Sequence, residues 1–101
     1  MGFAYRGGAL CVDAIPLQQI AREYGTPCYV YSQPAIESAY RAFAEALAGR
    51  DAMIAYSVKA NSNLAVLALL ARLGAGFDIV SGGELQRVKV AGGEPGKVLF
   101  S

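Results

Sequence analysis

The clearest pattern of hydrophobic and polar positions lies in the second half of the chain. The run Ala52–Tyr56 is typical of a buried strand, and a helix expected from Leu64 to Leu73 is apolar nearly all round. Asn61-Ser62-Asn63 offers side-chain oxygens that can cap this helix, and Gly74 can end it in the left-handed conformation. We therefore expect the helix to be buried between a sheet and a neighbouring layer.

Two further strands follow with short links. The sequence predicts a strand at Phe77–Val80, a tight turn at residues 81–83, a helix at Glu84–Ala91 and the start of another strand at Lys97–Ser101. From residue 52 onward the order is strand, helix, strand, helix, strand, which is typical of parallel βα units. Such units form a barrel or an open doubly wound sheet, and periodicity does not choose between them.

The first half of the chain predicts smaller elements. Residues 9–13 read as a short strand, and a helix from Pro16 to Tyr24 is ended by Gly25. Thr26-Pro27 should lead into a strand at Cys28–Tyr31.

A second helix is expected from Ser32, as its cap, to about Leu47. One face of it carries Tyr40, Phe43, Ala44 and Leu47, and this apolar stripe predicts a helix packed on the core.

The composition is typical of an α/β protein and does not indicate a charged partner such as nucleic acid or a membrane surface. It has 101 residues, 54% of them hydrophobic and 17% charged, and a net charge of +1. Without a basic stripe, neither nucleic acid nor a membrane surface is expected as a partner. The longest apolar run is far shorter than a spanning helix, and the first residues do not form a secretory signal, so a cytoplasmic location is expected.

Cysteine and histidine contents narrow the chemistry. The two cysteines, Cys11 and Cys28, each lie in an apolar, strand-like setting, where a reduced and buried thiol is expected rather than a disulfide. The sequence contains no histidine. Neither a histidine-based metal site nor a Ser-His-Asp triad can be built from this segment alone, and no metal is expected.

Lys59 is the candidate for chemistry, because it follows the buried strand at Ala52–Tyr56. An ammonium there must be solvated, paired or made neutral, and desolvation would lower the pKa of the amine and favour attack on an aldehyde. Lys59 is therefore a candidate anchor for pyridoxal phosphate. The alternative is a lysine that extends into solvent, and residue type and position alone favour that interpretation.

Asp78 and Ser81 should lie on the same rim as Lys59. All three residues come at or just beyond the carboxyl ends of predicted neighbouring strands, which share one edge of a parallel sheet. A lysine and an aspartate there can pair, either to orient the amine or as a structural ion pair. Strand alternation places Ser57 on the same face as Lys59.

Several motifs together resemble a known family. Tyr56-Ser-Val-Lys-Ala-Asn61 is followed by Gly74-Ala-Gly-Phe-Asp78 and Ser81-Gly-Gly-Glu-Leu85, and the likeness extends from Ile20–Ser32 to Lys97–Ser101. In this order the motifs are similar to the amino-terminal part of the alanine-racemase-like, fold-type-III enzymes that use pyridoxal phosphate.

The resemblance implies an α/β fold that is the N-terminal part of a pyridoxal-phosphate-binding (β/α)8 barrel. Residues 33–101 would be the first βα units of this barrel. Residues 1–32 would be a strand-helix-strand segment that packs with a β-rich C-terminal domain. Because a whole barrel needs about 250 residues, we expect the chain to be incomplete, inactive alone and prone to aggregate when isolated. In full length it would complete its active site as a homodimer.

For the site, the resemblance implies that Lys59 binds the cofactor as a Schiff base and that Asp78 lies close to it. Ser57 would fit under the cofactor ring, at a position where the family more often has alanine. Ser81-Gly82-Gly83-Glu84 could present backbone N–H groups to a phosphate, but two glycines after a strand are more typical of a turn. Glu84 is expected in the first turn of a helix, with a role near the cofactor as the alternative.

For the reaction, the resemblance implies the decarboxylases that convert meso-diaminopimelate to L-lysine and carbon dioxide, so an amino acid is the expected small-molecule partner. One alternative is an ornithine or arginine decarboxylase, or an amino-acid racemase, of the same fold. The other is a non-catalytic protein with a single barrel that binds pyridoxal phosphate. The predicted strands before residue 32 argue against this last alternative, because a lone barrel has no evident use for them.

Overall fold

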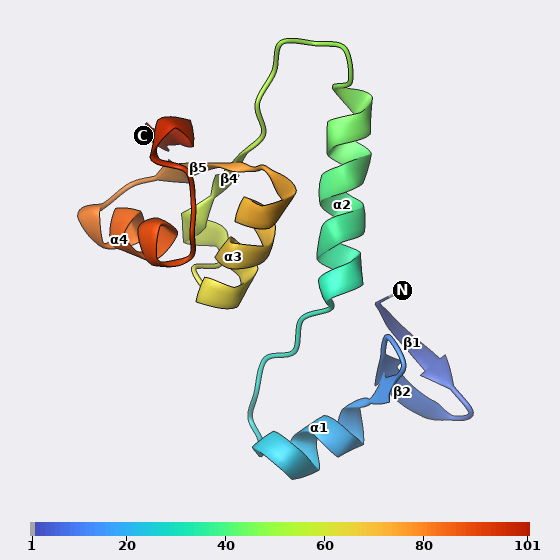
Figure 1. The fold of residues 1–101 in the computed structure, drawn as a ribbon. Coiled ribbons are helices and arrows are strands. Elements are labelled where there is room, and N and C mark those ends of the chain that lie inside the picture. Colours follow the sequence, from blue (N-terminus) through green and yellow to red (C-terminus); the bar gives the residue numbers. More distant parts are fainter. Residues whose placement is uncertain (1) are drawn as a thin grey trace. The chain divides into compact units, whose positions relative to one another are not determined.

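A computed structural model describes residues 2–101, which form two compact units. The first unit ends at Ala39 and the second is Tyr40–Ser101, so the division falls inside the longest helix (Figure 1). Along the chain the elements are β1 (Phe3–Arg6), β2 (Ala9–Val12), β3 (Ile15–Pro16), α1 (Leu17–Tyr24), α2 (Gln33–Ala46), β4 (Ala55–Ser57), the 3₁₀ turn η1 (Val58–Ala60), α3 (Leu64–Leu73), β5 (Gly76–Ile79), α4 (Gly82–Val90), the 3₁₀ turn η2 (Pro95–Lys97) and β6 (Val98–Phe100).

The first unit is built on an antiparallel sheet in the order β1-β2-β3. Phe3 pairs with Val12 and Arg6 with Ala9, and the turn between them has two glycines with positive φ. Cys11 and Val12 are buried, whereas every residue of β1 is exposed. The strand predicted at residues 9–13 corresponds to β2, while β1 was not predicted.

Asp13 connects the end of this hairpin to the start of α2. Its backbone has a φ of 55°, and its Oδ1 accepts hydrogen bonds from the Gly2 N–H at 2.8 Å and from the Ser32 hydroxyl at 2.9 Å. The Ser32 Oγ in turn accepts a hydrogen bond from the Ala35 N–H at 3.2 Å. The prediction that Ser32 caps this helix is therefore confirmed.

The segment before Ser32 differs from the prediction. Residues 28–31 carry no strand, because no strand of the described residues pairs with them, and Cys28 is exposed rather than buried. Cys11 is buried and free, as predicted. Tyr29 and Tyr31 stack with ring centroids 6.4 Å apart, and the Tyr29 side chain stays 89% exposed.

The apolar stripe of α2 was predicted to be core, and this prediction is wrong for the described residues. No residue of α2 is buried, and Phe43 is 61% exposed. An amphipathic pattern indicates which face of a helix can be buried, but it does not specify what covers that face.

The second unit contains a parallel sheet in the order β4-β5-β6, which confirms the predicted βα units. β4 begins at Ala55, three residues later than predicted, and Ala55 pairs with Gly76. A Cβ atom on Gly76 would lie 2.6 Å from the Lys97 carbonyl oxygen and 2.9 Å from the Met53 Sδ. Only glycine therefore allows the Lys97 carbonyl and the Met53 side chain to lie this close to the backbone of β5.

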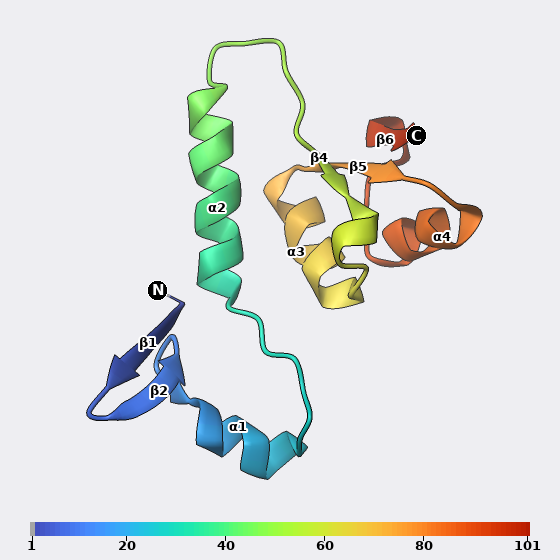
Figure 2. The same cartoon turned by 180° about the vertical axis from the view of Figure 1, so that it is seen from behind.

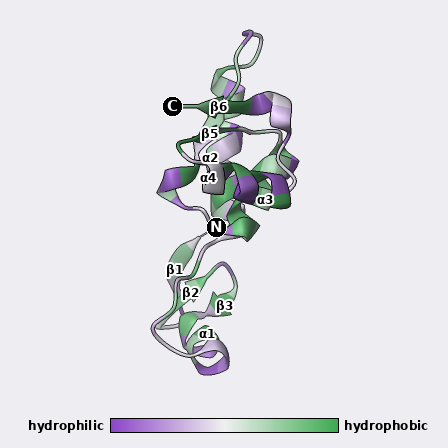
Figure 3. Cartoon of the chain, turned by 90° about the vertical axis from the view of Figure 1, so that its left-hand side faces the viewer, coloured by the Kyte–Doolittle hydropathy of each residue, from purple (hydrophilic) through white to green (hydrophobic). Residues whose placement is uncertain are grey.

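The core of the second unit lies between the sheet and the helices α3 and α4, which Figures 1 and 2 show together on one side of β4 and β5. Its fully buried side chains are Phe77, Leu67, Val58 and Val88. Figure 3 shows α3 mainly in the hydrophobic colour.

Helix α3 starts and ends as its sequence predicts, but it is less buried than expected. The Asn63 side chain accepts a hydrogen bond from the Ala65 N–H at 2.9 Å, and Gly74 ends the helix with a φ of 99°. Only part of the helix is buried, and Leu64 is 41% exposed. The expectation of burial on two sides is wrong for the described residues, which include no second layer over α3.

Candidate active site

Lys59 lies on a short turn that is fixed at both ends. β4 ends at Ser57, so Lys59 is the second residue beyond the strand and belongs to η1. The Tyr56 hydroxyl donates a hydrogen bond to the Asn61 carbonyl at 2.9 Å, and the Asn61 N–H donates to the Val58 carbonyl at 3.1 Å. Val58 is completely buried. The backbone around Lys59 is therefore held in place although its own side chain is exposed.

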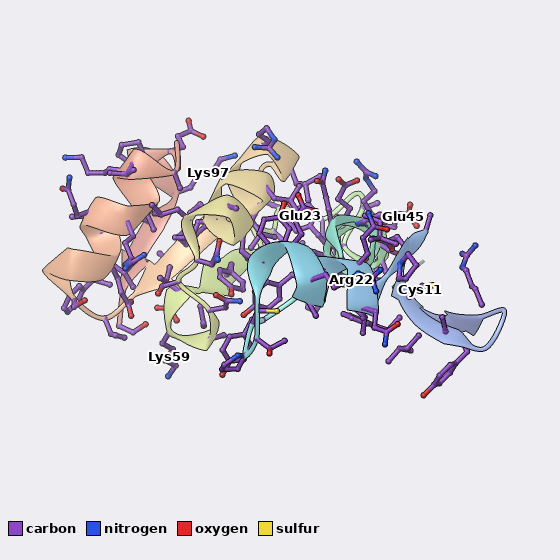
Figure 4. The ribbon with its side chains drawn as sticks, turned by 90° about the horizontal axis from the view of Figure 1, so that it is seen from below. Cys11, Arg22, Glu23, Glu45, Lys59 and Lys97 are labelled. Carbon is purple, nitrogen blue, oxygen red and sulfur yellow. The ribbon has the colours of Figure 1, made fainter. Side chains whose placement is uncertain are left out.

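The exposure of Lys59 corrects one step of the sequence argument. Its side chain extends away from the ribbon, as Figure 4 shows. The described residues thus do not provide the desolvation that would activate the amine. Strand alternation also stops at Ser57, so it does not determine the direction of Lys59.

Asp78 joins three consecutive strands through its two carboxylate oxygens. Ser57 on β4 is its register partner and donates a hydrogen bond to Oδ2 at 3.0 Å. Ser101, which follows β6, donates to Oδ1. The sequence predicted that Lys59, Asp78 and Ser81 share one rim and that Ser57 lies on the same face as Lys59. It gave no role to Ser101.

The pKa of the Asp78 carboxyl lies below its ordinary value. The hydrogen bond from Ser101 is the largest cause, followed by the one from Ser57, and the positive charge of Lys59 adds to both, while burial opposes them. Lys59 acts through space, because among residues 2–101 no hydrogen bond or ion pair joins it to Asp78. The direct pair considered from the sequence is not formed.

This lowered pKa also gives the sign of a stability effect. A carboxylate whose pKa is depressed by folding stabilises the fold above its unfolded pKa. The contribution is lost as pH falls through the folded pKa, below the ordinary value of 3.8 for Asp78. The interaction is therefore fully present at neutral pH.

The two faces of the parallel sheet have different chemistry. Phe77 and Ile79 point to the buried side and are 0% and 3% exposed. The opposite face carries Ala55 and Gly76 together with Ser57 and Asp78, since residues paired across neighbouring strands lie on the same face. At Gly76 this face is covered by the Met53 side chain and the Lys97 carbonyl. At its carboxyl edge, a primary amine near a carboxylate can condense with an aldehyde.

Ser81 and Glu84 cap α4 instead of facing Lys59. The Ser81 Oγ accepts a hydrogen bond from the Glu84 N–H at 3.1 Å, and the Glu84 Oε1 accepts one from the Val80 N–H at 2.8 Å. These two hydrogen bonds engage the N–H groups of Val80 and Glu84, which could otherwise bind an anion. The tight turn predicted at residues 81–83 is not formed, because α4 already begins at Gly82, whereas Glu84 lies in the first turn of this helix as predicted.

Two residues that hold the site were missed by sequence reasoning. Ser101 reaches Asp78 only because β6 pairs with β5, and no local pattern records that contact. Tyr56 was assigned to the strand, although its hydroxyl closes the turn around Lys59. The available signal was the residue type, because a buried or half-buried tyrosine hydroxyl usually finds a hydrogen-bond partner.

Within residues 2–101, no group of three or more His, Cys, Asp or Glu side chains is placed to hold a metal ion. None of the described helices is long and apolar enough to cross a membrane.

Comparison with known proteins identifies the family. Residues 33–101 match the family model described as pyridoxal-dependent decarboxylase, pyridoxal binding domain. The chain is 59% identical over 99 residues to the diaminopimelate decarboxylase of Pseudomonas aeruginosa, covering 98% of this chain and 24% of that protein. It thus spans about a quarter of the length of this curated relative.

Solved structures agree with this assignment. The diaminopimelate decarboxylase of M. jannaschii in complex with L-lysine superimposes with a TM-score of 0.91 at 36% identity, over 98% of this chain and 24% of that one. The Helicobacter pylori enzyme, also with L-lysine, gives a TM-score of 0.78 at 42% identity, over 83% and 21%. The mixed α/β fold therefore corresponds to the N-terminal region of these enzymes, and the chain belongs to the pyridoxal-dependent decarboxylases, within their pyridoxal binding domain.

Proposed function

We propose that the protein containing this chain decarboxylates meso-diaminopimelate to L-lysine and carbon dioxide, with pyridoxal phosphate attached to Lys59. The names of the relatives support the reaction, and the L-lysine in two structural neighbours supports an amino acid as ligand. The single observation that carries the proposal is Lys59, on a hydrogen-bonded turn just beyond the carboxyl end of β4, where Ser57 pairs with Asp78.

The residues present fit the aldehyde end of pyridoxal phosphate. Lys59 offers a primary amine that is exposed and therefore accessible, while its backbone is fixed by Tyr56 and Val58. Lys59 would hold the cofactor, with Ser57 and Asp78 close to it.

When bound, pyridoxal phosphate supplies an electron sink for the electron pair left by the departing carboxylate. The chain's own residues perform the other tasks. Lys59 binds the aldehyde, and its amine, once displaced by the substrate amine, is free to carry a proton. The Asp78 carboxylate attracts this amine and thereby orients it. The turn held by Tyr56 and Val58 limits how far Lys59 can move.

The proposal extends to the organisation of the whole protein. Residues 33–101 would form the first βα units of a (β/α)8 barrel, and residues 1–32 would pack with a β-rich domain. A homodimer would complete the active site, in the cytoplasm. The parallel order β4-β5-β6 with helices on one side supports the barrel.

Borohydride reduction of the natively expressed protein, followed by peptide mapping, tests the cofactor site. A pyridoxyl group should be found on Lys59. The variant Lys59→Ala should lose the label, and carbon dioxide release should fall by at least about 10²-fold. Lys89→Ala is the matched control, because Lys89 is exposed on α4 and should keep both label and activity.

The substrate is tested by carbon dioxide release from meso-diaminopimelate, L-ornithine and L-arginine. Preference for meso-diaminopimelate supports the proposal, whereas preference for either other amino acid indicates a sister decarboxylase. A labelled Lys59 without turnover of any amino acid would indicate a binding protein. An unlabelled Lys59 would contradict the cofactor site itself.

A further inference from the structure

The hydrogen bonds around Asp78 occupy both of its oxygens from opposite sides. Ser57 on β4 donates to Oδ2 at 3.0 Å, and Ser101 beyond β6 donates to Oδ1. Asp78 itself lies on β5, between those strands. The backbone repeats this arrangement, because Ser57 is paired with Asp78 and the Ser101 N–H donates to the Ile79 carbonyl at 3.0 Å.

Strand geometry explains why these three side chains meet. Asp78 is paired with Leu99, so their side chains lie on the same face of the sheet. Ser101 directly follows β6, and the hydrogen bond from its N–H to the Ile79 carbonyl holds it beside β5. The contact therefore follows from the register of the sheet, and not from a chance rotamer at one site.

The hydrogen bonds favour one protonation state of Asp78. An ionised carboxylate only accepts hydrogen bonds, and here it has a hydroxyl donor at each oxygen. Protonation would remove the charge that strengthens both hydrogen bonds. Among the described residues, Lys59 on η1 is the charged group that acts on Asp78, and it also favours the anion.

We propose that Ser57 and Ser101 are positioning residues that keep Asp78 as a fixed anion beside Lys59, so that Asp78 orients the lysine amine and does not itself carry protons during turnover. This inference rests on the function proposed above. In this inference Lys59 carries the proton during turnover, and Asp78 only attracts the lysine amine by its negative charge.

The first test measures Asp78 directly, by the pH dependence of its carboxyl ¹³C shift in the protein with and without pyridoxal phosphate. In Ser57→Ala and in Ser101→Ala the Asp78 titration should move to higher pH, and it should move further in the double variant. Ser57→Thr retains a hydroxyl and should restore the original titration. Ser38→Ala, at an exposed serine of α2, is the control and should change nothing. An unchanged titration in both alanine variants would overturn the inference.

The second test separates a fixed anion from a proton carrier. In Ser57→Ala, kcat should fall about three- to tenfold as the orientation of Lys59 relaxes, equivalent to about 1 kcal/mol. The limbs of the kcat profile should stay at the same pH even though the Asp78 titration has moved. A limb that moves together with the Asp78 titration would identify Asp78 as a proton carrier and overturn the inference.

Failure of this inference is distinguishable from failure of the proposed function. The Asp78 titration is read without cofactor and does not depend on turnover. Absence of a pyridoxyl group on Lys59 would contradict the function while the effect of the serines on Asp78 could still be measured. A labelled Lys59 with an unchanged Asp78 titration would contradict only the inference.

Discussion

The two compact units of this chain are held by different kinds of interaction. In the first unit, polar contacts of Asp13 join the hairpin to Ser32, and few side chains are buried. In the second, Phe77, Leu67 and Val88 form an apolar core under a parallel sheet. The candidate site lies in the second unit, where buried Val58 and the paired strands fix the residues that must stay in place. A reactive lysine can be exposed and still well positioned when its backbone is anchored in a core.

The largest effect is expected when the core of the second unit is emptied. Phe77 is completely buried, so Phe77→Ala leaves a cavity and should lower the free energy of unfolding by about 3–5 kcal/mol. Phe43→Ala is the matched control: Phe43 is 61% exposed, and its removal should cost less than about 1 kcal/mol. Urea denaturation of the protein that contains this chain measures both.

Both residues lie in the second unit, and equal losses in these two variants would contradict the exposure of Phe43. They would indicate that another part of the protein covers the apolar stripe of α2 and that Phe43 is buried there. The stripe would then be core, as its periodicity predicts.

Local signals predicted the order and the ends of the elements better than their burial and pairing. The order of strands and helices after residue 52, the Asn63 cap and the left-handed Gly74 follow from neighbouring residues and were correct. The burial of α2 and the strand at residues 28–31 depend on partners distant in sequence, and both predictions failed.

The candidate site shows the same limit. Asp78 could be assigned to the rim of the sheet because parallel strands end together, and it accepts a hydrogen bond there from Ser57. The contribution of Ser101 required the register of β6, which no local pattern contains. The exposure of Lys59 depends on what surrounds the turn, and residue order does not specify that.

An intermediate effect is expected from overpacking. A Cβ atom on Gly93 would lie 2.4 Å from the Val88 Cγ1 and 3.1 Å from the Phe77 ring, so Gly93→Ala should destabilise the fold by about 1–3 kcal/mol. Gly96→Ala is the matched control, since no atom lies within 4 Å of its added Cβ. Thermal unfolding of the two variants checks this. Equal midpoints would show that the core near Val88 yields easily, which would weaken the contrast between the units.

The smallest effect is expected in the first unit, at its polar connection. Ser32 is 4% exposed, accepts from the Ala35 N–H and donates to Asp13, so Ser32→Ala should cost about 1–2 kcal/mol. Because the two contacts share one hydroxyl, amide exchange should accelerate both at Ala35 and at Asp13, whose N–H donates to the Gly2 carbonyl.

Ser81→Ala provides the contrast in the second unit. Ser81 caps α4 by accepting from the Glu84 N–H, and among residues 2–101 it has no comparable contact with a distant strand. Amide exchange should therefore accelerate only in the first turn of α4. An effect of Ser32→Ala that stays within the first turn of α2 would show that the hairpin does not depend on this hydroxyl. The first unit would then be held by the buried apolar side chains of β2, Cys11 and Val12. The two units would differ in the size of their cores, and not in the kind of interaction that stabilises each of them.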